Sequence, residues 1–179
     1  MASSFSFSES YGASSGGDIN YINFQSNDGT SGSDATTNTA ANPIVIPASL
    51  YAYSYERVIR GHWSGTFSTI TSVYFWKQSG TLPGSVKIKA LKKASSPTTY
   101  VQPVTTASTI LGVAGNEVNT TADIPTATGT INPAFNATSQ GTPAQTNSSD
   151  YIYMQLVVPS GSASGSISTM TYRMGWNET

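Results

Sequence analysis

The chain has one histidine, His62, which lies in the stretch GHWSG two residues before Ser64. A hydrolase triad would require this histidine beside a nucleophile and oriented by a carboxylate. On a strand, alternation would place His62 and Ser64 on the same face, but the sequence links no carboxylate to them. We therefore interpret His62 as a surface or interface histidine near a turn, rather than as a catalytic base.

Two other patterns match enzyme motifs in form alone. Residues 12–16 read GASSG, but a G-x-S-x-G nucleophile elbow joins a strand to a helix, and this stretch lies in a Ser/Gly-rich segment. The nine acidic residues are scattered, so no pair is marked as a glycosidase acid and nucleophile. Asp18, Asp28 and Asp34 lack the spacing of a calcium loop. We expect no enzymatic activity, no metal and no cofactor.

The lysines are concentrated in one part of the chain. All five lie between residues 77 and 93, where they could protect an edge strand from pairing with other chains or form a basic patch for an acidic partner surface. A nucleic-acid partner is not expected, because the sequence pI of 5.7 is far from that of a basic domain. The candidate contact lysines are Lys87, Lys89, Lys92 and Lys93.

Aromatic side chains are a second class of candidate contact residues, because exposed rings can stack on sugar rings. Most of the 19 aromatic residues fall at alternating positions typical of a core. Tyr51, Tyr53 and Tyr55 alternate along one face of a predicted strand and form the best candidate for an exposed stripe.

Composition limits the class of protein. At 179 residues the chain suits one domain, and only 9% of its residues are charged, against about 25% in ordinary soluble domains. The net charge of −1 gives little protection against self-association. This favours a protein that functions within an assembly. The absence of cysteine excludes disulfides and thiolate metal sites.

The termini and the hydropathy pattern predict no targeting or membrane segment. MASSFSFSESYGASSGGD has neither the basic nor the apolar region of a secretory signal. No apolar run approaches the 18 residues of a transmembrane helix. We expect synthesis in a cytoplasm, where the protein either stays or from which it leaves inside a particle, and no membrane partner.

Residues 1–40 are rich in Ser, Gly, Thr, Asn and Asp and predict a flexible N-terminal arm. One island within it, DINYINFQ at residues 18–25, is apolar enough to be a strand or a docking segment. The arm is either a disordered tail or a segment that orders on a neighbouring subunit by strand addition. Its candidate contact residues are Ile19, Tyr21, Ile22 and Phe24.

Residues 41–179 predict one β-domain, because short alternating runs recur between turn residues and no segment has helical periodicity. NPIVIP suits an edge strand between prolines, and TSVYFWK suits a strand in the middle of a sandwich. The weakest region is a Pro/Thr-rich loop at about 119–149. Strands are predicted at 42–47, 51–60, 71–77, 85–93, 100–104, 108–113, 128–132, 150–158 and 169–176.

The closing hairpin is the clearest element. Ile152, Met154, Leu156 and Val158 are predicted to face the core, with Tyr151, Tyr153 and Gln155 opposite; Met170, Tyr172, Met174 and Trp176 share one face of the return strand. Together these strands predict an all-β fold, an antiparallel β-sandwich of Ig-like or jelly-roll type.

The runs NPIVIP, YSYERVIRGHWSGTFSTITSVYFWK and LPGSVKIKA, followed by DYIYMQLVVPSGSASGSISTMTYRMGWNE, resemble small β-sandwich structural proteins of tailed bacteriophages, in particular capsid decoration (cement) proteins. The resemblance covers about residues 42–93 and 150–178. It implies a virion protein without cofactor or catalytic residues, often trimeric, that clamps neighbouring subunits of the major capsid protein on the capsid surface. The alternatives are a tail- or fibre-associated virion protein, or a carbohydrate-binding, receptor-binding module.

Overall fold

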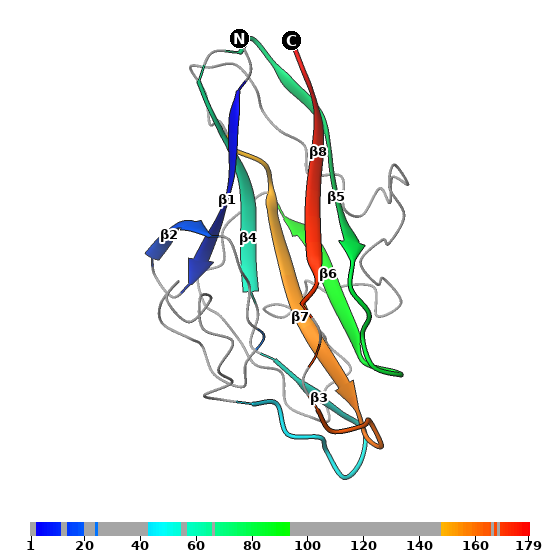
Figure 1. Cartoon of the computed structure of the whole chain (residues 1–179). Coiled ribbons are helices and arrows are strands. Elements are labelled where there is room, and N and C mark those ends of the chain that lie inside the picture. Colours follow the sequence, from blue (N-terminus) through cyan, green and yellow to red (C-terminus); the bar gives the residue numbers. More distant parts are fainter. Residues whose placement is uncertain are drawn as a thin grey trace.

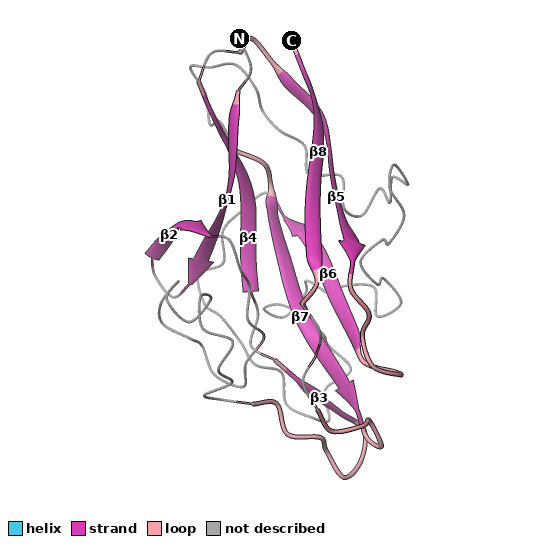
Figure 2. Cartoon of the chain, in the orientation of Figure 1, coloured by secondary structure: helices cyan, strands magenta, loops and turns pink. Residues whose placement is uncertain are grey.

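The computed structural model describes residues 3–11, 14–19, 24, 43–54, 57–65, 67–93, 148–165, 167 and 169–179. Every regular element in this part of the chain is a β-strand, and every pairing is antiparallel (Figure 2). The all-β prediction is therefore confirmed, while the choice between an Ig-like and a jelly-roll sandwich stays a prediction. The strands are β1 (Ser4–Tyr11), β2 (Ser14–Ile19), β3 (Tyr51–Tyr53), β4 (Arg57–Ser64), β5 (Ile70–Ser79), β6 (Lys87–Lys93), β7 (Tyr151–Pro159) and β8 (Thr171–Glu178).

The strands form two sheets (Figure 1). The larger sheet runs β2-β1-β4-β7-β3, with β6 also pairing with β7. The smaller sheet is the β5–β8 ribbon. Strand β7 is thus the centre of the larger sheet, since it pairs with β3, β4 and β6.

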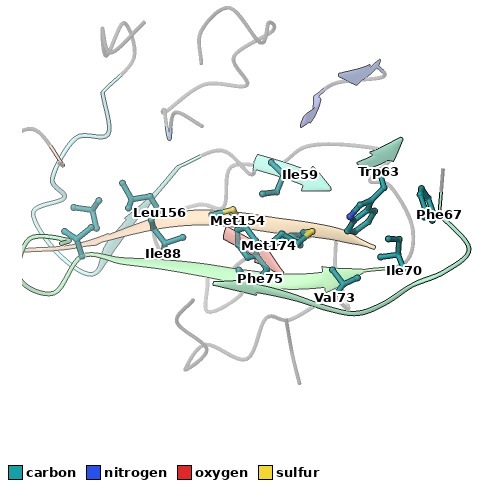
Figure 3. Close-up of a cluster of buried hydrophobic side chains, with 14 residues drawn as sticks. Ile59, Trp63, Phe67, Ile70, Val73, Phe75, Ile88, Met154, Leu156 and Met174 are labelled. Atoms are coloured by element: carbon teal, nitrogen blue, oxygen red, sulfur yellow. The ribbon is translucent and has the colours of Figure 1, made fainter. Parts of the chain in front are cut away.

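In the described part of the chain, a hydrophobic core lies between the two sheets (Figure 3). The larger sheet contributes Ile59 and Met154, and the ribbon contributes Phe75 and Met174; each is at most 7% exposed. The predicted closing hairpin does not form, because β8 pairs with β5 in the ribbon whereas β7 lies in the larger sheet. The inward residues predicted for these two strands are nevertheless confirmed. Ile152, Met154, Leu156, Val158 and Met174 are buried, and Met170, Tyr172 and Trp176 pack against the cluster.

Strands β3 and β4 form one interrupted edge along β7. Tyr53 pairs with Val157 and the backbone of Ser54 with Leu156, whereas Arg57 pairs with Met154. Val157 and Met154 lie on opposite faces of β7, so Tyr53 and Arg57 also lie on opposite faces of the sheet. The predicted strand at 51–60 with strict alternation, which would place both on one face, is therefore wrong.

Strand β7 is buried along both faces. Tyr153 and Gln155, on the face turned away from the ribbon, are 2% and 0% exposed. This corrects the expectation of a strand with one core face, because an all-buried strand lies in a sheet that is covered on both sides.

The N-terminal segment corrects the sequence prediction of a flexible arm at residues 4–11 and 14–19. Strand β1 pairs with β4 along its length, and β2 pairs with β1. Phe5 packs against Trp63 and Trp176 with ring centroids 5.4 and 4.8 Å apart. The alternating Ser-Phe-Ser-Phe pattern of β1 thus supplies two rings to the core, a period-two signal hidden by the serine-rich composition. Apart from Phe24, the rest of the predicted arm lies outside the described residues.

The stretch from Pro43 to Leu50 has no strand pairing, contrary to the prediction of an edge strand in NPIVIP. Ile44 and Ile46 nevertheless pack against the core. The prolines that flank this run carry no amide hydrogen for a sheet ladder, so it runs extended beside the core without joining a sheet. The predicted strands at 100–104, 108–113 and 128–132, and the predicted loop apart from Ser148 and Ser149, lie outside the described residues.

Candidate contact surfaces

His62 contacts a serine, but not the one suggested by its neighbourhood in the sequence. Its Nδ1 lies 3.1 Å from the Oγ of Ser148, and the two residues form an isolated antiparallel bridge. Next to them, the Gly61 amide donates to Ser149 Oγ, and the Ser149 amide donates to the Gly61 carbonyl, both at 2.9 Å. These four residues thus fasten β4 to the stretch before β7. The contact of His62 with Ser148 is part of this connection.

Arg60 is held in the same way. Its Nη1 donates to the Tyr151 hydroxyl at 3.0 Å, and its guanidinium carbon lies 4.5 Å from the centre of that ring. The pair joins β4 to the start of β7 as a cation–π contact with one added hydrogen bond.

Glu178 joins the two sheets at the end of the molecule that holds both termini. The amide and the hydroxyl of Ser3 donate to its carboxylate at 2.9 and 2.6 Å. These hydrogen bonds, the side-chain one first, lower the pKa of Glu178 below its ordinary 4.5, because they stabilise the charged form. In the described part of the chain, no three His, Cys, Asp or Glu side chains are grouped to hold a metal ion.

The predicted tyrosine stripe does not form as an exposed surface. Tyr51 is 46% exposed, but Tyr53 is only 3% exposed, and Tyr55 lies outside the described residues. Burial and the neighbouring Tyr51 raise the pKa of Tyr53. Tyr53 faces the same side of the sheet as buried Val157, its partner on β7, so it packs instead of presenting a ring to a ligand.

The lysine cluster divides into different environments. All four candidates lie on β6, which pairs only with β7 among the described residues. Lys87 is exposed, whereas Lys89 is 4% exposed opposite Gln155, so its prediction as an outward contact residue is wrong. Lys92 and Lys93 pair with Ile152 and Tyr151 through the backbone, and their side chains lie outside the described residues.

The apolar island of the predicted arm is only partly described. Ile19 ends β2 opposite Phe7, and Phe24 packs half-buried against the core. Tyr21 and Ile22 lie outside the described residues. Phe24 therefore has a place inside its own chain, which weighs against its role as a free docking residue.

Three exposed hydrophobic residues that lie close together in the sequence, Val45, Leu50 and Tyr51, are here called the apolar tip. These are the exposed large hydrophobic residues of the described chain, with exposed fractions of 76%, 53% and 46%. The tip lies beside β3, at the end of the molecule opposite the two termini (Figure 1). Leu50 anchors it, because its carbonyl accepts a 2.8 Å hydrogen bond from the Ser160 amide after β7.

The second surface is the face of the β5–β8 ribbon turned away from the core, here called the outer ribbon face. Tyr74 pairs with Gly175 and Trp76 with Arg173, while Phe75 and Met174 between them point into the core. Sequence reasoning missed this face because TSVYFWK is apolar at nearly every position, which suggested a strand buried on both sides. The outward positions are Thr71, Tyr74, Trp76, Ser79, Thr171, Arg173, Gly175 and Asn177.

The described residues contain no helix that is long and apolar enough to cross a membrane. Comparison with protein-family models, curated proteins and solved structures gives no match to this chain.

Proposed function

We propose that the chain is a non-enzymatic virion structural protein, a capsid decoration protein that binds across subunits of the major capsid protein and stabilises the head. The proposal begins with the sequence resemblance to such proteins. It is supported by the described candidates for chemistry, since His62, Arg60 and Glu178 each fasten one strand to another segment of the fold.

The observation that carries the proposal is the backbone conformation of Leu50 together with the exposure of its side chain. Its φ of 59° lies in the left-handed region, which costs a bulky residue on the order of 1–3 kcal/mol. Its side chain is also 53% exposed, so the domain gains little burial in return. A strained, exposed leucine is expected where its side chain contacts a partner, because backbone strain is concentrated at functional sites.

The geometry around Leu50 suits a contact made by one end of an elongated domain. Val45 and Tyr51, which are also exposed, lie five positions before Leu50 and one position after it in the sequence, and exposed apolar patches mark interaction sites. The termini lie at the far end (Figure 1), so the tip can dock without displacing β1 or β8. A small patch suffices when many copies, or a homotrimer, bind one particle at the same time.

The test replaces Leu50 with asparagine, which tolerates the left-handed conformation and is polar. Binding is measured by co-sedimentation with heads of the encoding virus that were assembled without this protein. We expect Leu50→Asn to keep or raise the melting temperature and to weaken binding at least about tenfold, equivalent to 1.4 kcal/mol.

The control is Gln78→Ala, an exposed change on β5 away from the tip, which should bind like the wild type. Unchanged binding of Leu50→Asn would refute the role of the tip. Binding of the wild type to tails but not to heads would replace the decoration role with a tail-associated one. Light scattering adds the oligomeric state, with a trimer expected at three times 18.8 kDa.

A further inference from the structure

The outer ribbon face presents two aromatic rings that the core does not use. Tyr74 and Trp76 are half-buried, and the register places both on the side opposite Phe75 and Met174. The larger sheet packs on the opposite side of the ribbon, through the core residues Phe75 and Met174. The rings therefore lie outside the core that the two sheets share.

Gly175 determines how the Trp76 ring lies. A Cβ at position 175 would be 3.2 and 3.3 Å from Cζ3 and Cη2 of Trp76, closer than ordinary contact. The six-membered ring therefore extends across the ribbon over β8, in space that only a glycine leaves open. The indole Nε1 is buried without a hydrogen-bond partner, so the exposed part of the side chain is aromatic carbon.

The side chains around the two rings are hydrogen-bonding groups with little charge. By register, Thr71 and Asn177 lie at one end of the face and Ser79 and Thr171 at the other, and all four are exposed. Arg173, opposite Trp76, is the single charged residue among the outward positions. An aromatic surface surrounded by hydroxyl, amide and guanidinium groups matches a pyranose, whose C–H face is apolar and whose rim carries hydroxyls.

The area of the patch favours a small ligand over a protein. Each ring side chain can bury about 150–250 Å², so the two supply at most about 500 Å². A stable protein interface needs about 800 Å² on each partner, and the rest of this face is polar. A sugar of one to three rings is the partner that such an area can cover.

We propose that the outer ribbon face is a carbohydrate-binding site in which a pyranose stacks on Trp76 and hydrogen-bonds to Arg173 and Asn177. The ligand class is a neutral or weakly acidic glycan, because Arg173 can accept a carboxylate and no carboxylate lies at the outward positions to repel one. This binding is separate from docking through the apolar tip.

The experiment titrates the full-length protein with cellohexaose, chitohexaose, mannohexaose and sialyllactose, each to about 10 mM, which detects a millimolar Kd. Binding is followed by calorimetry. We expect at least one of the four to bind, Trp76→Ala to lose at least tenfold in affinity, and Trp76→Phe to retain part of it while keeping the fold. Tyr51→Ala, which removes an exposed ring elsewhere, should bind like the wild type.

The outcomes separate this site from the proposed function. Leu50→Asn should leave glycan affinity unchanged, and Trp76→Phe should leave binding to heads unchanged. The proposal is overturned if none of the four saccharides binds, or if Trp76→Ala binds as tightly as the wild type with an unaltered melting temperature. Loss of head binding in Trp76→Phe would also overturn it, because the face would then be a protein contact.

Discussion

Substituting Gly61 with alanine should destabilise the fold through a single methyl group. Gly61 is buried on β4 where the larger sheet meets the ribbon. A Cβ there would collide with the thioether of Met174 and lie 2.9 Å from Cε2 of Phe5. The Met174 side chain would have to move, and the Phe5 ring beside it is held in place by Phe7, Trp63 and Trp176.

The sign of the effect tests this packing. In open space, replacing glycine by alanine would stabilise the protein by about 0.4–1 kcal/mol, because the unfolded chain loses freedom. Overpacking instead costs typically 1–3 kcal/mol. We expect the second result, a loss of about 1–3 kcal/mol. For a chain of this length it lowers the melting temperature by about 2–12 °C, at roughly 2–4 °C per kcal/mol.

The assay is urea unfolding of Gly61→Ala, Met174→Ala and the double variant. Met174→Ala alone should cost about 2–5 kcal/mol by opening a cavity. In that background the added methyl occupies freed space, so the two changes should couple by about 0.5–3 kcal/mol. A stabilising Gly61→Ala, or strictly additive effects, would show that the two sheets do not meet at Gly61 as described.

Three further predictions concern buried or tied polar groups. Ser3→Ala should lower the melting temperature, and the full difference from wild type should be seen above pH 4.5. The difference should vanish as the pH falls, because the hydrogen bonds that lower the pKa of Glu178 stabilise the fold only while its carboxylate is charged. Burial raises the pKa of Tyr172 above 10, so wild type should lose stability above pH 10 while Tyr172→Phe shows a flatter decline; equal declines would contradict the burial. Ser54→Ala removes the acceptor of the buried Leu156 amide at 2.9 Å and should cost about 1–3 kcal/mol, seen as a lower urea midpoint with an unchanged slope.

The candidate sites could be predicted only as residue types. The sequence offered His62 beside Ser64, but the serine within reach, Ser148, follows 86 positions later and is brought there by the pairing of β4 and β7. No local pattern marks such a partner. The tip was missed for another reason: Leu50 stands out through its backbone angle and its exposure, neither of which sequence reports.

Much of the fold followed from alternation alone. The inward set Ile152 to Val158 and the face shared by Met174 and Trp176 were read from period-two patterns, because successive side chains on a strand point to opposite sides. The absence of helical periodicity likewise predicted an all-β chain, and every described element is a strand.

Tertiary structure decided which of two faces is covered, and where alternation is interrupted. At Ser72, with φ 52°, a register shift in β5 lets both Ile70 and Val73 face the core, which strict alternation forbids. Coverage of the face of the larger sheet that is turned away from the ribbon buries both Tyr53 and Lys89, whose partners on β7 are Val157 and Gln155. Local sequence specifies two faces for each strand, whereas burial of either depends on long-range pairing and packing. The sequence by itself therefore determined the all-β class and the alternation within the last two strands, and the packing of the two sheets determined that Trp76 faces away from the core.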